Sequence, residues 1–98
     1  MSAQAIQGRI QILKDLASQL SATIVDEEAR DHFLRPIWSS LTDAEYTLSQ
    51  GLKAPNPAHA SLWFEGTGLF LRNAEVQLKG AQGMVSKYGP SLRVVGGG

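Results

Sequence analysis

The chain has 98 residues, 43% of them hydrophobic and 18% charged, and its nine basic side chains balance nine acidic ones. This composition predicts a single globular domain over residues 1–98 and excludes a disordered chain. A net charge of zero lacks the basic excess that binds nucleic acids, so we expect no nucleic acid partner. Without cysteine, neither a disulfide nor a thiolate metal site can form.

No apolar stretch reaches the roughly 20 residues that cross a bilayer, and residues 1–22 lack the compact apolar block of a secretory signal. We therefore expect no membrane span, and a protein that is cytoplasmic or exported without a cleavable signal peptide.

Apolar residues in the first segment recur at spacings of three and four, which is typical of one helix face. They are Ile6, Ile10, Leu13, Ala17, Leu20 and Ile24. Ser2 can cap this helix at its start. Its end is open at this point, because Thr23 or Asp26 can cap a new helix, so both a continuous rod and a bend fit the pattern.

Pro36 predicts the next boundary, since it has no N–H to donate and its ring pushes Arg35 away from helical angles. We expect a kink or a restart there, followed by a helix that runs to Gln50. The apolar residues that share a face around it are Leu34, Ile37, Trp38, Leu41, Ala44 and Leu48.

The strongest interruption lies almost at the midpoint, over residues 51–57, where Asn56 can serve as N-cap and Pro57 as the first helical residue. From Pro57 to about Tyr88 the pattern is helical again, and we expect its internal glycines to admit a close neighbouring helix. These are Gly66, Gly68, Gly80 and Gly83. The sequence predicts a flexible glycine-rich tail over residues 89–98.

These elements predict an all-α fold. Two helical arms joined at a proline-rich turn indicate an antiparallel hairpin whose first arm is kinked near Pro36, with a three-helix bundle as the variant.

Ionisable residues gather at the start of the second helical segment. Glu28 and His32 stand one turn apart, a spacing at which two side chains can bind one metal ion. The alternative function is therefore a small bundle that binds a metal or an apolar ligand through Glu28, His32 and His59. We prefer a solvated helix start whose carboxylates favour the helix dipole and pair with Arg30 or Arg35, with no metal or other cofactor.

No serine lies in a Gly-x-Ser-x-Gly motif, and no glycine cluster has the spacing and lysine of a phosphate loop. Two scattered histidines do not define a catalytic triad, because a triad depends on geometry. We therefore expect no enzymatic activity.

Large apolar side chains surround the second arm on more than one side. Leu62-Trp63-Phe64 and Leu69-Phe70-Leu71 place consecutive side chains about 100° apart around a helix, so one neighbouring arm cannot cover them all. Ile12 and Leu16 also lie off the main stripe of the first helix. A second packed surface follows, lined by Trp63, Phe64, Leu69, Phe70, Ile12 and Leu16. This pattern predicts an interaction or assembly subunit, in a homo-oligomer or a heteromeric complex.

The turn Pro55-Asn56-Pro57-Ala58, followed by a helix that contains Leu71-Arg72-Asn73-Ala74, is similar to the needle-type subunits of type III secretion systems. Those subunits are small helical hairpins that polymerise, so the resemblance implies filament-type assembly. Trp63-Phe64 and the long first arm depart from that pattern. Trp63-Phe64-Glu65-Gly66 resembles, with one residue too many, the central Trp-x-Gly of helical hairpins that type VII systems secrete.

Overall fold

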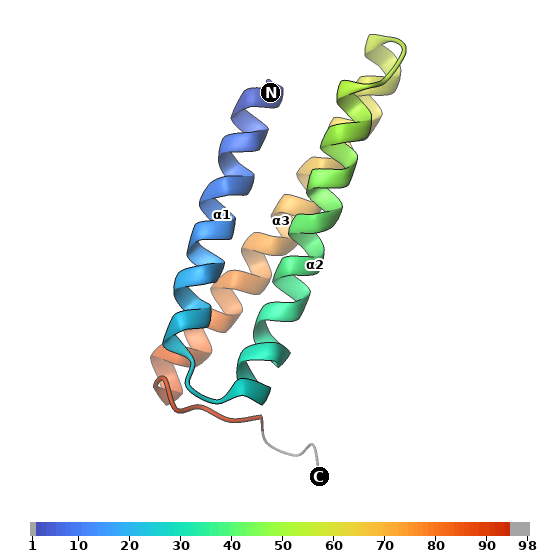
Figure 1. The fold of residues 1–98 in the computed structure, drawn as a ribbon. Coiled ribbons are helices and arrows are strands. Elements are labelled where there is room, and N and C mark those ends of the chain that lie inside the picture. Colours follow the sequence, from blue (N-terminus) through green and yellow to red (C-terminus); the bar gives the residue numbers. More distant parts are fainter. Residues whose placement is uncertain (1, 95–98) are drawn as a thin grey trace.

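The computed structural model describes residues 2–94, and over these residues the chain forms three α-helices and no strand (Figure 1). Helix α1 spans Ala3–Thr23, α2 spans Glu27–Leu52 and α3 spans Pro57–Tyr88. The fold is thus all-α, as predicted, and takes the three-helix form. It is elongated, with extents of 49 × 25 × 17 Å.

The helix ends follow the capping residues of the sequence. The side chains of Ser2, Asp26 and Asn56 each accept a hydrogen bond from the backbone N–H three residues later, which satisfies a donor that the first turn leaves free. Pro57 occupies the first turn of α3, and Gly89 ends that helix with a φ of 82°, an angle that favours glycine. The predicted caps at Ser2 and Asn56 and the predicted end near Tyr88 are confirmed.

The first boundary lies between Thr23 and Glu27, where the chain reverses direction, and not at Pro36. Arg30 holds this loop together, since its guanidinium donates hydrogen bonds to the carbonyls of Ile24 at 3.0 and 3.2 Å and of Val25 at 3.2 Å. Of the two alternatives for the end of the first helix, a continuous rod or a bend, the structure has the bend.

Of the kink or restart that we expected at Pro36, the restart does not occur, because α2 continues through this residue from Glu27 to Leu52. Pro36 is exposed, whereas Leu34 and Ile37 on either side of it are buried. Burial of these flanking side chains holds the helix in place despite the hydrogen bond that proline cannot make.

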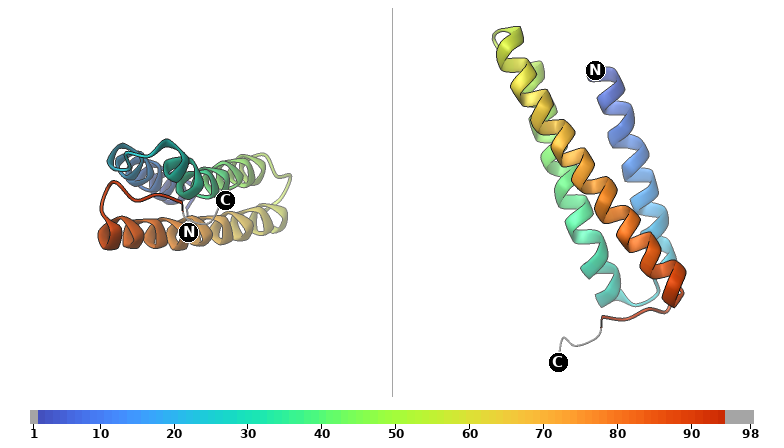
Figure 2. Two further views of the ribbon diagram at one scale, coloured as in Figure 1. Left: turned by 90° about the horizontal axis from the view of Figure 1, so that it is seen from below. Right: turned by 180° about the vertical axis from the view of Figure 1, so that it is seen from behind.

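The three helices form two layers. Helices α1 and α2 lie side by side, and α3 covers one side of the pair (Figure 2). The most extensive contact joins α2 and α3, which run antiparallel through the turn at residues 53–56, and α1 packs against both. The fully buried side chains with the largest volumes are Ile24, Ile37, Leu41, Leu71 and Thr67.

Part of the expected tail belongs to the folded domain. Leu92 is buried against the core, and the Val25 N–H donates a 2.9 Å hydrogen bond to the carbonyl of Pro90. Residues 89–94 thus close the end of the bundle beside the α1–α2 loop. Residues 95–98 of the predicted tail lie outside the described residues.

Close helix contact occurs at a glycine other than those expected. A Cβ placed on Gly51 in α2 would lie 2.8 Å from the Phe64 Cδ1 atom, so the ring of Phe64 needs a residue without a side chain there. Cβ atoms at Gly68, Gly80 and Gly83 would meet nothing within 4 Å, and one at Gly66 would only touch Thr47 at 3.9 Å. The expectation that these four glycines admit a neighbouring helix of the same chain is wrong.

Candidate interaction surface

The residues predicted to bind a partner lie in different environments. Ile12 on α1 and Leu69 on α3 are both 60% exposed. Leu16, Phe64 and Phe70 are partly buried against the hydrophobic core, and therefore serve the fold. Trp63 is half-buried, with its ring edge-on to Tyr46 at 6.2 Å between centroids. Burial alone thus singles out Leu69 and Ile12 as free apolar side chains.

Leu69 belongs to a row of exposed apolar residues along α3. Leu62, Leu69 and Val76 are 65%, 60% and 66% exposed, and seven residues separate each from the next. Seven residues make nearly two turns, so the three side chains project from one side of the helix about 10.5 Å apart. The buried residues of α3, including Leu71 and Leu78, occupy the opposite side. Sequence reasoning missed Leu62 and Val76, although their spacing from Leu69 was the available signal.

Two charged residues complete this row. Glu65 and Arg72 lie between the apolar residues, are exposed, and form no ion pair with any other residue in the range 2–94. We call Leu62, Glu65, Leu69, Arg72 and Val76 together the α3 outer face. It lies on the side of α3 opposite the buried residues of that helix, and α3 is the front helix when the molecule is seen from behind (Figure 2).

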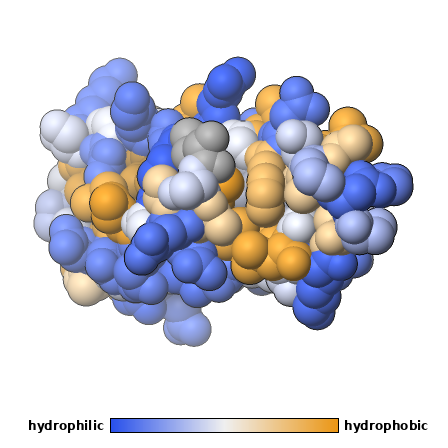
Figure 3. Space-filling model, turned by 90° about the horizontal axis from the view of Figure 1, so that it is seen from above, coloured by the Kyte–Doolittle hydropathy of each residue, from blue (hydrophilic) through white to orange (hydrophobic). Residues whose placement is uncertain are grey.

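Apolar side chains also reach the end of the molecule where α2 meets α3. In the view onto this end, hydrophobic residues are interleaved with hydrophilic residues, and the largest hydrophobic patch lies near the middle (Figure 3). Leu52 and Tyr46 are exposed residues of this part of α2. The α3 outer face is distinguished by its regular spacing along one helix.

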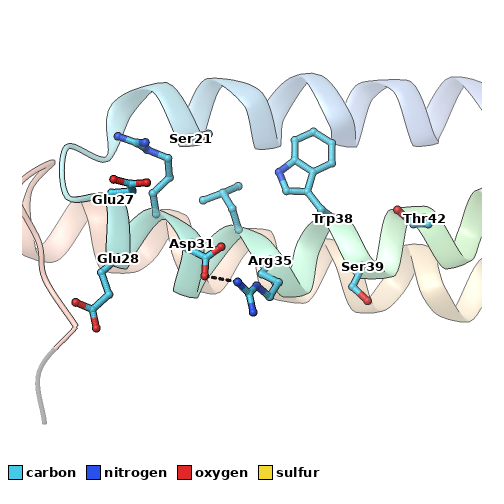
Figure 4. Close-up of a pocket in the computed structure, with 10 residues that line it drawn as sticks. Ser21, Glu27, Glu28, Asp31, Arg35, Trp38, Ser39 and Thr42 are labelled. Atoms are coloured by element: carbon cyan, nitrogen blue, oxygen red, sulfur yellow. Dashed lines mark ion pairs between the residues drawn. The ribbon is translucent and has the colours of Figure 1, made fainter. Parts of the chain in front are cut away.

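A groove of about 970 Å³ runs between α1 and α2, lined largely by polar and charged residues (Figure 4). Trp38 reaches towards α1, whereas Glu28 points away from it. Asp31 and Arg35 form an exposed 2.8 Å ion pair along α2. The acidic residues Glu27 and Glu28 lie in the first turn of α2, where they favour the helix dipole.

A second hollow, of about 650 Å³, lies where residues 91–94 cross the ends of α2 and α3. Its apolar lining comes from Phe33, Met84, Tyr88, Leu92 and Val94. No buried polar side-chain atom in the described part of the chain lacks a hydrogen-bond partner, so no unsatisfied polar group marks this hollow as a ligand site.

The three residues of the alternative metal site do not lie together in the structure. Glu28 and His32 lie at the start of α2, and His59 lies at the start of α3, which is the opposite end of the bundle. Roughly 30 Å of helix separates the two ends, at 1.5 Å per residue. Among residues 2–94, no group of three His, Asp or Glu side chains can hold a metal ion.

No protein family, curated protein or solved structure matches the chain. Across the described helices, none is both long and apolar enough to cross a membrane.

Proposed function

We propose that the chain is a non-enzymatic interaction subunit that binds another protein chain through the α3 outer face. The observation that carries this proposal is the regular exposure of Leu62, Leu69 and Val76 on a helix whose other side is fully packed. The row is not needed to bury the core, because α1 and α2 already cover the inner side of α3.

The energetics favour a partner. Burial of a large aliphatic side chain that is otherwise exposed stabilises an assembly by about 1.5 to 3 kcal/mol. Three such residues in line, with a charged residue after each of the first two, provide an apolar centre and a polar rim, which is the usual composition of an interface. One apolar row and two charged residues, Glu65 and Arg72, on the same side of α3 thus supply both affinity and orientation.

The test compares two variants of equal exposure. Leu69→Asp places a charge in the middle of the α3 outer face, and Ile12→Asp places the same charge on α1, where the wild-type residue is also 60% exposed. Each tagged chain is purified from the cells that produce it, and the mass of the eluting particle is measured by light scattering. Thermal unfolding followed by circular dichroism verifies that each variant remains folded.

We expect wild type and Ile12→Asp to elute in a particle heavier than the 10.6 kDa chain, and Leu69→Asp to elute at 10.6 kDa. Equal masses for the two variants would contradict the assignment of the interface to α3. A wild-type mass of 10.6 kDa would contradict the proposed function itself.

A further inference from the structure

We propose that the chain covering the α3 outer face is a second copy of the same protein, with the two α3 helices antiparallel about a two-fold axis at Leu69. This inference rests on the proposed function and specifies its partner. It derives from the order of apolar and charged residues along the exposed side of α3.

The apolar row is symmetric about Leu69. Leu62 lies seven residues before it and Val76 seven residues after it. When two such helices run antiparallel about this centre, Leu69 meets its own copy, and Leu62 of each chain meets Val76 of the other. All three exposed side chains of both copies are then covered in three apolar layers, which is the self-complementarity that a two-fold interface requires.

The charges agree with the same register. Glu65 precedes Leu69 by four residues and Arg72 follows it by three, so Glu65 of one copy lies almost level with Arg72 of the other. Both residues project on the same flank of the apolar row, where an antiparallel pair brings them together. The axis creates this ion pair twice, between two charges that form no ion pair within residues 2–94 of one chain.

The opposite flank of the apolar row carries Gly66 and Asn73. Gly66 of one copy lies almost level with Asn73 of the other, and a Cβ on Gly66 would have only one neighbour within 4 Å, the Thr47 methyl at 3.9 Å. Neither residue carries a charge, so this flank adds no like-charge contact to the antiparallel pair.

The charges also exclude the neighbouring register. An axis midway between Leu69 and Val76 would still pair these two apolar residues. It would, however, bring Arg72 against Arg72 of the second copy, and like charges across an interface are unfavourable. The Leu69-centred register is the one that satisfies both the apolar row and the charges.

This arrangement closes on itself. Each copy uses the same surface, so pairing yields a dimer and leaves no free α3 outer face for a filament. The paired stretch from Leu62 to Val76 covers about 22 Å of helix. A contact of this length is at the small end of specific interfaces, so we expect self-association in the micromolar range.

The decisive test exchanges the two charges in the full chain. Glu65→Arg places arginine opposite Arg72 at both ion pairs, and Arg72→Glu places glutamate opposite Glu65. Each variant alone should dimerise roughly tenfold or more weakly than wild type in sedimentation equilibrium. An equimolar mixture of the two variants should recover the wild-type affinity, because every position 65 then faces a position 72 of opposite charge.

Recovery in the mixture also shows that both variants are folded. Variants that stay weak when mixed, or that never weaken, would overturn the Leu69-centred antiparallel pair.

Cysteine cross-linking gives an independent readout of register, because the natural chain contains no cysteine. Leu69→Cys should oxidise to a disulfide-linked dimer on its own. Leu62→Cys should cross-link only when mixed with Val76→Cys, and Ile12→Cys should not cross-link under the same conditions. Efficient cross-linking of Leu62→Cys with itself would overturn the proposed register.

Two mass measurements distinguish a second copy from a different protein as the partner. If the wild-type chain, separated from every other protein of the particle, stays at 10.6 kDa up to high micromolar concentration, the second copy is not the partner. If the particle from cells nevertheless dissociates on Leu69→Asp, the α3 outer face binds a different protein, and the proposed function stands.

Discussion

A hydroxyl pair inside the α2–α3 contact offers a quantitative test of how these helices are held. The Thr47 and Thr67 Oγ1 atoms are 2.6 Å apart, and both residues are buried. Each hydroxyl also has an acceptor in its own helix: the Ala44 carbonyl is 3.1 Å from the Thr47 hydroxyl, and the Trp63 carbonyl is 3.0 Å from the Thr67 hydroxyl. One hydroxyl therefore donates within its helix while the other donates across to it.

This geometry sets the expected cost of replacing either residue by valine. Thr47→Val or Thr67→Val keeps the shape of the side chain and removes the interhelical hydrogen bond, which contributes about 1 kcal/mol net. The remaining hydroxyl still bonds to its own helix, so the larger penalty of about 1 to 3 kcal/mol for an unsatisfied buried group is avoided. The double variant loses the same hydrogen bond only once, so it should be no less stable than either single variant.

The assay is urea unfolding followed by circular dichroism for wild type, the two single variants and the double variant. All four are measured at one protein concentration, because association would change the apparent stability. We expect a coupling free energy of about 1 kcal/mol between the two positions. Costs that simply add in the double variant would refute the interhelical hydrogen bond, and a cost above about 3 kcal/mol in a single variant would refute the alternative acceptors.

Three further substitutions, one of them with a matched control, test the fold. Pro36→Ala should stabilise the protein by about 1 to 3 kcal/mol, because Pro36 is exposed inside an unbroken helix and alanine restores the missing donor; an unchanged or lower melting temperature would contradict this. Arg30→Met should lower the free energy of unfolding in urea by about 1 to 3 kcal/mol, because the Arg30 side chain donates hydrogen bonds to the carbonyls of the α1–α2 loop. Arg35→Met removes an exposed ion pair and should change the same free energy by less than about 1 kcal/mol. Leu92→Ala should lower the melting temperature by at least about 8 °C, since a buried leucine contributes about 2 kcal/mol or more to stability. An unchanged melting temperature would mean that Leu92 does not pack against the core.

The sequence was sufficient for the helices themselves because their signals are local. The three- and four-residue spacing from Ile6 to Ile24 marks the buried side of α1, and Asn56 with Pro57 marks the start of α3. Pro36 left both a kink and a restart open in the sequence, because the rule that proline interrupts a helix considers only the backbone. The burial of Ile37 outweighs it, and burial depends on residues far away in the sequence.

The interaction surface was predicted only in part for the same reason. Consecutive large side chains such as Phe64 and Leu69 look equally available in a sequence, and only the position of α2 distinguishes the ring that fills the space at Gly51 from the side chain that faces outward. The register of the exposed row, in contrast, is a seven-residue spacing that a helical-wheel analysis of α3 would have revealed.

Thiol alkylation of the assembly purified from its own cells measures whether another chain covers the α3 outer face. Val76→Cys and Val25→Cys make the same substitution at residues that are 66% and 69% exposed in the single chain, and each variant then contains one thiol. We expect the thiol at position 76 to react several-fold more slowly than it does when Leu69→Asp is also present, and the thiol at position 25 to react at the same rate with or without that change. Equal rates at position 76 in both backgrounds would contradict it.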